Sequence, residues 1–192
     1  MTAVVEGELA RGILIVLRSK TMVDAAQDYE WRRDPELATF DAARPYNGSL
    51  REYTSIFNDE LNYPSPYRKT IAVEDLNGTH IGNVMYYNAD FHRREAEIGI
   101  TIGLREYWSR GYGTDLMQTF AGFLFESLNL DRIYLKTLDW NVRAQRCFEK
   151  AGFARYGVSR RGDYNFILME LRRADFNGED EPPPRSRPTT PG

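Results

Sequence analysis

Residues 97–114 read EIGITIGLREYWSRGYGT, and this stretch decides the fold. Three isoleucines at every second position, Ile98, Ile100 and Ile102, predict a strand with one buried face. Beyond the Gly-x-Gly turn, apolar residues recur at spacings of three and four up to about Leu128, which predicts a helix packed on a sheet. The stretch therefore predicts a strand, a glycine turn and a helix in direct succession.

The turn between this strand and this helix has the features of an anion site. A helix N-terminus carries unpaired N–H groups and the positive end of the helix dipole, so it attracts phosphate. Gly111 and Gly113 let a ligand approach the backbone, and Arg110 adds a positive charge. Tyr112 and Thr114 complete the run of N–H groups. A P-loop would need Gly-Lys-Ser/Thr, and a dinucleotide fingerprint would need a third glycine near position 116. Both are absent, so the sequence predicts a phosphate-bearing ligand of another kind.

Length and composition limit the classes of protein to consider. The 192 residues suffice for one domain, and 42% hydrophobic with 28% charged residues is typical of a soluble globular protein. The formal net charge of −3 argues against a general nucleic-acid binder. One cysteine excludes an intramolecular disulfide, and two histidines cannot build a usual zinc site. The apolar run 13–17 is too short for a signal or membrane segment, so we expect a cytoplasmic protein without a metal.

The order of the predicted elements indicates an α/β fold. Strands are expected over 12–18, 69–74, 80–88, 95–102, 132–138, 153–159 and 164–171. Helices are expected over 22–33, 50–61, from the glycine turn to 128, and over 142–150. Mixed alternation of this kind predicts a single twisted sheet with helices on both faces. We expect a loose arm over 1–11, a domain over 12–174 with an irregular loop at 34–48, and a disordered, proline-rich tail over 175–192.

Two motifs resemble those of the GCN5-related N-acetyltransferase (GNAT) superfamily. The run WSRGYG at 108–113 is similar to its acyl-CoA loop, Gln/Arg-x-x-Gly-x-Gly/Ala, with Trp108 in the first place. With a tryptophan in this place, the loop resembles that of the branch of ribosomal-protein and spermidine acetyltransferases. The run NVRAQRCFEKAGF at 141–153 resembles the family's second motif, Asn-x-x-Ala/Ser…Gly-Phe. The element order over roughly 12–172 is also similar to the acetyltransferase fold, with its mixed and partly splayed sheet.

The resemblance implies that acetyl-CoA is the cosubstrate. Its pyrophosphate would lie on residues 110–114, and its pantetheine arm would pair with the backbone of Ile100 and Ile102, where two strands splay apart. Asn141 would contact the cofactor, although its role as a helix cap is enough to explain its presence. Arg143 and Arg146 could approach the phosphates, but exposed helix arginines are common.

Acetyl transfer to an amine needs a base, because an alkyl ammonium of pKa ~10 is mostly charged at neutral pH. Glu97 is the candidate, since a carboxylate on a central strand is rarely buried without a purpose. The Glu-Ile-Gly run also resembles the family's strand, where the corresponding glutamate often acts as base. A salt bridge to Arg93 or Arg94 is the alternative.

The general acid is where the chain departs from the family pattern. Many members have a tyrosine at the place of Phe148, and the ribosomal-protein branch often has a serine at Ala144. Neither hydroxyl is present, so Tyr112 or Cys147 serves, or the thiolate leaves unassisted. A buried, structural role is the commoner one for such a cysteine.

The resemblance implies a direct N-acetyltransferase, and a protein N-terminal amine is the first acceptor to consider. A polyamine or other small amine is the second, because the helix at 22–33 and the residue after it carry acidic side chains that we expect to be exposed: Asp24, Asp28, Glu30 and Asp34. A simple solvated face is the alternative. The missing hydroxyls would also suit a non-catalytic acyl-CoA-binding module. The family often pairs through its late strands, so a homodimer is plausible, and no membrane partner is expected.

Overall fold

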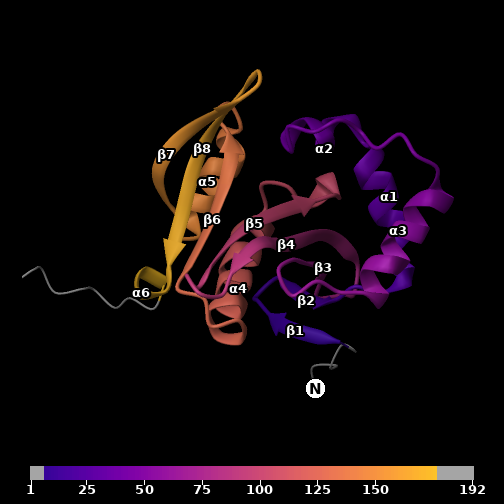
Figure 1. Ribbon diagram of the computed structural model, residues 1–192, viewed down its shortest axis with the longest axis horizontal. Helices are drawn as coiled ribbons and strands as arrows, with labels where there is room; N and C mark the ends of the chain where they lie inside the picture. Colours follow the sequence, from indigo (N-terminus) through magenta and orange to yellow (C-terminus); the bar gives the residue numbers. More distant parts are fainter. Residues whose placement is uncertain (1–6, 177–192) are drawn as a thin grey trace, which may run out of the picture.

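The computed structural model describes residues 7–176. Their strands form one eight-stranded sheet (Figure 1). Its strand order is β1-β2-β3-β4-β5-β6-β8-β7, and β5 with β6 is the one parallel pair. The strands are β1 (Glu8–Arg11), β2 (Ile15–Ser19), β3 (Lys69–Asp75), β4 (His80–Asp90), β5 (Glu95–Ile102), β6 (Arg132–Leu138), β7 (Ala154–Arg161) and β8 (Tyr164–Arg172).

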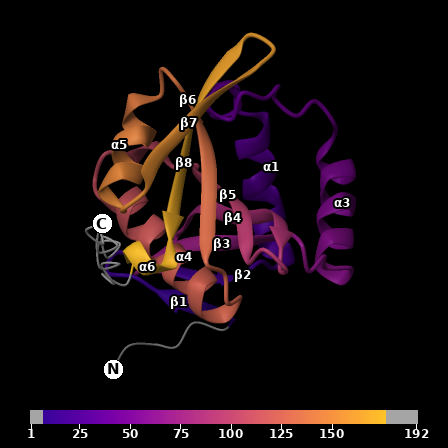
Figure 2. The ribbon, with the colours of Figure 1, turned by 60° about the vertical axis from the view of Figure 1, so that its left-hand side comes forward.

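Helices cover both faces of the sheet (Figure 2). One face carries α4 (Tyr112–Ser127) and α5 (Val142–Lys150), which contribute to the main hydrophobic core. The other carries α1 (Ala25–Arg33), α2 (Pro35–Phe40) and α3 (Leu50–Asn62). Short 3₁₀ helices, η1 (Met22–Asp24) and η2 (Arg105–Tyr107), precede α1 and α4, and α6 (Arg173–Phe176) follows β8. The single mixed sheet with helices on both faces is therefore confirmed.

The core lies between the sheet and α4, as the apolar spacing of that helix predicts. Met117, Phe120, Ala121 and Leu124 are buried there, and Ile98 meets them from β5. Burying the four large side chains among them stabilises the fold by about 6–12 kcal/mol, at roughly 1.5–3 kcal/mol for each. The helix at the glycine turn is thereby fixed against the strand that precedes it.

The sheet opens between β5 and β6. Their parallel pairing covers only Glu95–Glu97 against Arg132–Tyr134. Beyond this point β5 runs on to Ile102 and β6 to Leu138, with no further pairing between them. The partly splayed sheet expected from the family resemblance is confirmed.

Two predicted boundaries at the ends of the domain need correction. Residues 8–11, expected in a loose arm, form β1, whose Ala10 and Arg11 pair with Leu17 and Val16. This edge strand was missed because four mixed polar and apolar residues carry no clear period. Residues 175 and 176, expected in the tail, belong to α6. The rest of the tail, 177–192, and residues 1–6 lie outside the described residues.

The loop expected over 34–48 contains a helix, α2. Asp34 caps it by accepting hydrogen bonds from the N–H groups of Glu36 and Leu37, and Pro35 occupies its first position. Asp-Pro was interpreted only as the end of the preceding helix, but the same pair also starts one. This error matters because α2 borders the cavity described below.

The acidic face expected on the first helix is only partly present. Asp24 and Asp28 are buried, not exposed, and they form ion pairs with Arg18 and Lys20. His80 is also largely covered and lies against Asp24. Their burial follows from the packing of η1 and α1 on β2 and β4. This correction removes the structural reason given for a polyamine-binding surface on that helix.

No helix within residues 7–176 is long and apolar enough to cross a membrane.

Candidate functional site

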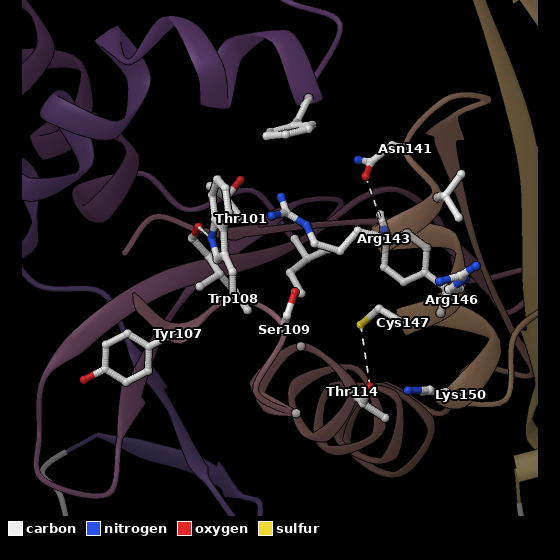
Figure 3. Close-up of a pocket in the computed structure, with 18 of the residues that line it drawn as sticks. Thr101, Tyr107, Trp108, Ser109, Thr114, Asn141, Arg143, Arg146, Cys147 and Lys150 are labelled. Atoms are coloured by element: carbon white, nitrogen blue, oxygen red, sulfur yellow. Dashed lines mark hydrogen bonds between the residues drawn. The ribbon is translucent and has the colours of Figure 1, made fainter. Parts of the chain in front are cut away.

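A cavity of about 540 Å³ occupies the opening between β5 and β6. Its walls come from α2, the end of β5, the loop into α4 and the start of α5 (Figure 3). The lining residues are Leu37, Phe40, Asp41, Ile100, Thr101, Ile102, Tyr107, Trp108, Ser109, Gly111, Gly113, Thr114, Asn141, Val142, Arg143, Ala144, Arg146, Cys147, Phe148 and Lys150. The cavity is thus built from segments far apart in the sequence.

The backbone of β5 forms one wall. The N–H of Gly103 donates to the C=O of Ile81 at 2.9 Å, which fixes the antiparallel register of β5 on β4. Because hydrogen-bonded and non-bonded pairs alternate in such a ladder, the backbone groups of Ile100 and Ile102 point away from β4. They therefore face the opening, although the indole N–H of Trp108 already donates to the C=O of Ile102 at 2.7 Å.

The loop into α4 forms the second wall. Gly111 has a φ of +91°, a backbone conformation that glycine adopts without strain. Gly113 must also lack a side chain, because a Cβ there would lie 2.9 Å from the Cys147 sulfur. The first backbone hydrogen bond at this end of α4 runs from the N–H of Asp115 to the C=O of Gly111 at 3.1 Å. The preceding N–H groups of the turn are available to an anion.

Two of the predicted cofactor residues do not line the cavity. Arg110 is exposed and donates to the backbone C=O of Glu106 at 3.1 Å. Tyr112 packs its ring edge-on against Tyr107, with the ring centroids 4.8 Å apart. The other six predicted cofactor residues do line the cavity: Ile100, Ile102, Gly111, Gly113, Thr114 and Asn141.

The start of α5 forms the wall opposite β5. The Asn141 side chain accepts from the N–H of Ala144 at 3.2 Å, so the predicted helix cap is present. The Thr114 hydroxyl donates to the Cys147 sulfur at 3.8 Å, which joins α4 to α5 (Figure 3). Burial raises the pKa of the Cys147 thiol, so at neutral pH this group is a protonated thiol. Cys147 lines the cavity and is therefore a candidate proton donor. Tyr112, the other candidate for that role, does not line the cavity.

Two aromatic rings, those of Phe40 and Trp108, close the cavity toward α2, and we call them the aromatic box. Phe40 and Trp108 lie edge to face, with the ring centroids 5.8 Å apart. The Arg143 guanidinium carbon lies 3.8 Å from the Trp108 centroid and 5.0 Å from that of Phe40. Arg143 reaches from α5 across the cavity toward Trp108 (Figure 3). The box therefore holds a cation supplied by the chain itself.

Glu97 does not line the cavity and is fully engaged. Its side chain accepts from the Tyr87 hydroxyl at 3.0 Å, the Asn88 amide at 3.1 Å and the Lys136 ammonium at 2.8 Å. Burial first, and the negative charge of Glu97 second, raise the pKa of Tyr87, which keeps its hydroxyl a donor. The salt bridge considered as an alternative is thus present, with Lys136 and not with a preceding arginine. The role of Glu97 as base stays a prediction.

Asp41 is the cavity carboxylate that sequence reasoning missed. It caps the C-terminus of α2 and, among the described lining residues, is the one acidic side chain. The residue as a whole is exposed, but burial of its carboxyl beside the cavity raises its pKa, and the charge of Arg32 opposes that rise. Its only sequence signal was an aspartate beside an aromatic residue, Phe40, in a segment interpreted as a loop.

The comparisons with known proteins agree with this geometry. A family model, the acetyltransferase (GNAT) domain, matches residues 15–154. An uncharacterized N-acetyltransferase p20 of Bacillus licheniformis is 26% identical over 148 residues, 76% of this chain and 82% of that protein. Aminoglycoside N(6')-acetyltransferase type 1 of Klebsiella pneumoniae is 28% identical over 177 residues, 84% of this chain and 85% of that protein.

A solved structure has the same fold. The spermidine N-acetyltransferase of Vibrio cholerae in complex with CoA and spermine superposes with a TM-score of 0.76 at 22% identity. The match covers 85% of this chain and 98% of that one. These relatives are N-acetyltransferases, which is consistent with an enzyme of that kind. By its domain match and its fold, this chain belongs to the acetyltransferase (GNAT) family.

Proposed function

We propose that this protein transfers an acetyl group from acetyl-CoA directly to a primary amine of a small cationic acceptor. One observation carries the proposal: in a chain of the GNAT family, the outward backbone edge of β5 and the N-terminus of α4 border the same cavity. A thioester with a long arm and a pyrophosphate needs both of these surfaces.

The described residues fit acetyl-CoA. The pyrophosphate would lie on the N–H groups of residues 110–114, where Gly111 and Gly113 leave the backbone open. The pantetheine arm would pair with the backbone of Ile100, and with that of Ile102 once Trp108 releases its carbonyl. Asn141 borders the same path. Arg110 and Tyr112 would contribute through their backbone, since their side chains point elsewhere.

A small cationic amine is preferred to a protein N-terminus as the acceptor. The names of the relatives state aminoglycoside and spermidine as their substrates, and one structure contains spermine. None of the three relatives described above names a protein N-terminus, the acceptor that the sequence placed first.

Calorimetric titration with acetyl-CoA tests the cofactor site, with Gly111→Asp beside Gly111→Asn. Both side chains tolerate a positive φ better than most residues do, so they impose similar backbone strain and differ in charge. We expect micromolar-range binding by the wild type, a modest loss in G111N, and a loss on the order of 10²-fold or more in G111D, because its carboxylate repels the pyrophosphate.

Three results are informative. Absence of binding by the wild type contradicts the proposal. Equal affinities of G111D and G111N place the pyrophosphate elsewhere. Binding of acetyl-CoA without turnover on spermidine, kanamycin or a peptide with a free N-terminus favours the non-catalytic module.

A further inference from the structure

Asp41 has a position that no other carboxylate of the described chain shares. It lies at the end of α2, beside Phe40, and lines the cavity together with Ile100 and Thr101 of β5. Ile100 is one of the residues whose backbone borders the path proposed for the thioester arm. Asp41 therefore faces the space between the aromatic box and the reacting end of that arm.

The carboxylate of Asp41 is also uncommitted. No hydrogen bond or ion pair within residues 7–176 reaches its oxygens, whereas three donors engage the carboxylate of Glu97. The charged and titratable groups that interact with it are Arg32 from α1 and Tyr87 from β4, each without a direct contact to it. Arg143 of α5 lines the same cavity, and the carboxylate that acts on it is Glu36. Asp41 is an exposed residue that lines the cavity, and a carboxylate without a partner in the protein attracts an incoming cation.

The neighbouring rings show which chemical group fits. Phe40 precedes Asp41 directly, and with Trp108 it holds the Arg143 guanidinium at cation–π distance. The rings of Phe40 and Trp108 therefore accept a cationic group, which in this structure is the Arg143 guanidinium. An alkyl ammonium is the group that the Asp41 carboxylate attracts, while the rings of Phe40 and Trp108 hold Arg143.

We infer that Asp41 binds the ammonium group of the acceptor and takes the proton that must leave before acetyl transfer. The inference rests on the proposed N-acetyltransferase activity and assigns its acceptor subsite to the α2 side of the cavity. It also assigns Glu97 a structural role, as the residue that joins β4 to β6 through Tyr87 and Lys136.

The step balances without a further reactant. One ammonium proton passes to a carboxylate oxygen of Asp41, and the freed nitrogen lone pair attacks the thioester carbonyl carbon. The C–N bond forms, and the C–S bond breaks as the thiolate leaves with its electron pair. The thiolate takes the second proton of the nitrogen, and Asp41 returns the first proton to water.

The test compares Asp41→Asn with Glu30→Gln, using acetyl-CoA with spermidine and with kanamycin as probes. D41N keeps the shape of the side chain and removes its charge. E30Q removes a charge at an exposed position of α1, outside the cavity. We expect kcat/KM for the accepted amine to fall on the order of 10²-fold or more in D41N, with a raised KM and a lowered kcat. E30Q should remain within about two-fold of the wild type.

Two further measurements separate this inference from the function on which it rests. The affinity of D41N for acetyl-CoA should stay within about three-fold of the wild type, and its thermal unfolding should be unchanged. The acidic limb of the pH profile of kcat/KM should be lost, since the group that must be deprotonated is gone. A D41N enzyme with wild-type kcat/KM and pH profile would overturn the inference alone. A wild type that neither binds acetyl-CoA nor acetylates either amine would overturn both.

Discussion

Glu97 and Asp41 are both carboxylates near the opening of the sheet, yet their surroundings are opposite. Glu97 is buried at the last residue of the β5–β6 ladder and accepts three hydrogen bonds. Asp41 faces the cavity, and no donor within residues 7–176 reaches it. A buried carboxylate that is hydrogen-bonded within the protein stabilises the fold, whereas an exposed one without a protein partner is available to a ligand. The comparison teaches that burial alone does not identify a catalytic group.

The largest effect is expected at another satisfied carboxylate, Asp28. It pairs with the buried Lys20 at 2.6 Å and accepts from Asn83 at 2.8 Å. Asp28→Asn leaves the Lys20 charge without its partner, which should lower the free energy of unfolding by about 3–5 kcal/mol. Denaturant unfolding measures this. D41N is the control and should change the same quantity by less than about 0.5 kcal/mol. Equal losses in the two variants would erase the distinction between the two kinds of carboxylate.

The next largest effect is a loss of stability at low pH, caused by Asp24. Burial alone would raise the pKa of Asp24, but the Arg18 guanidinium and the Thr21 N–H outweigh it and lower the pKa to about 2. Asp24 therefore contributes stability above its unfolded pKa of 3.8, and this contribution is lost as the pH falls from about 4 to about 2. We expect it to amount to about 2 kcal/mol. Unfolding curves of the wild type and Asp24→Asn across this range should converge at the acid end. A difference in the free energy of unfolding that stays the same across this pH range would contradict the lowered pKa of Asp24.

Glu97→Gln sharpens the comparison directly. Because the Lys136 side chain is 37% exposed, solvent screens the broken ion pair, and the stability loss should be about 1–2 kcal/mol. If Glu97 is structural, kcat should fall by less than about ten-fold. If it is the base, cofactor binding persists while kcat falls on the order of 10²-fold or more. Steady-state kinetics beside calorimetry with acetyl-CoA distinguishes the two roles.

The smallest effect is expected at Glu30, which is exposed on α1 with a long ion pair to Arg33 at 3.9 Å. Glu30→Ala should leave both the stability and the KM for spermidine unchanged within error. A clear rise in KM would restore the acidic helix as an acceptor surface, against the burial of its other members.

Local sequence was sufficient to predict the elements that rest on local physics. The Gly111 turn, the apolar face of α4 and the Asn141 cap each follow from residues within one or two helical turns. The partners of Glu97 could not be predicted in this way, because Lys136 lies 39 residues away and meets it only through strand pairing. Asp41 was missed because proline and glycine around α2 hid a six-residue helix. The proposed acceptor side thus depends on tertiary contacts, while the proposed cofactor side is encoded in a short motif.

The short parallel ladder between β5 and β6 has a consequence for amide hydrogen exchange. Thr101 donates its N–H toward β4, whereas the N–H groups of Ile100 and Ile102 face the opening. Neighbouring amides of one strand should therefore exchange at very different rates, fast at even positions and slow at odd ones. A cosubstrate that completes the missing ladder would slow the even positions and leave the odd ones as they are, so one strand would report occupancy residue by residue.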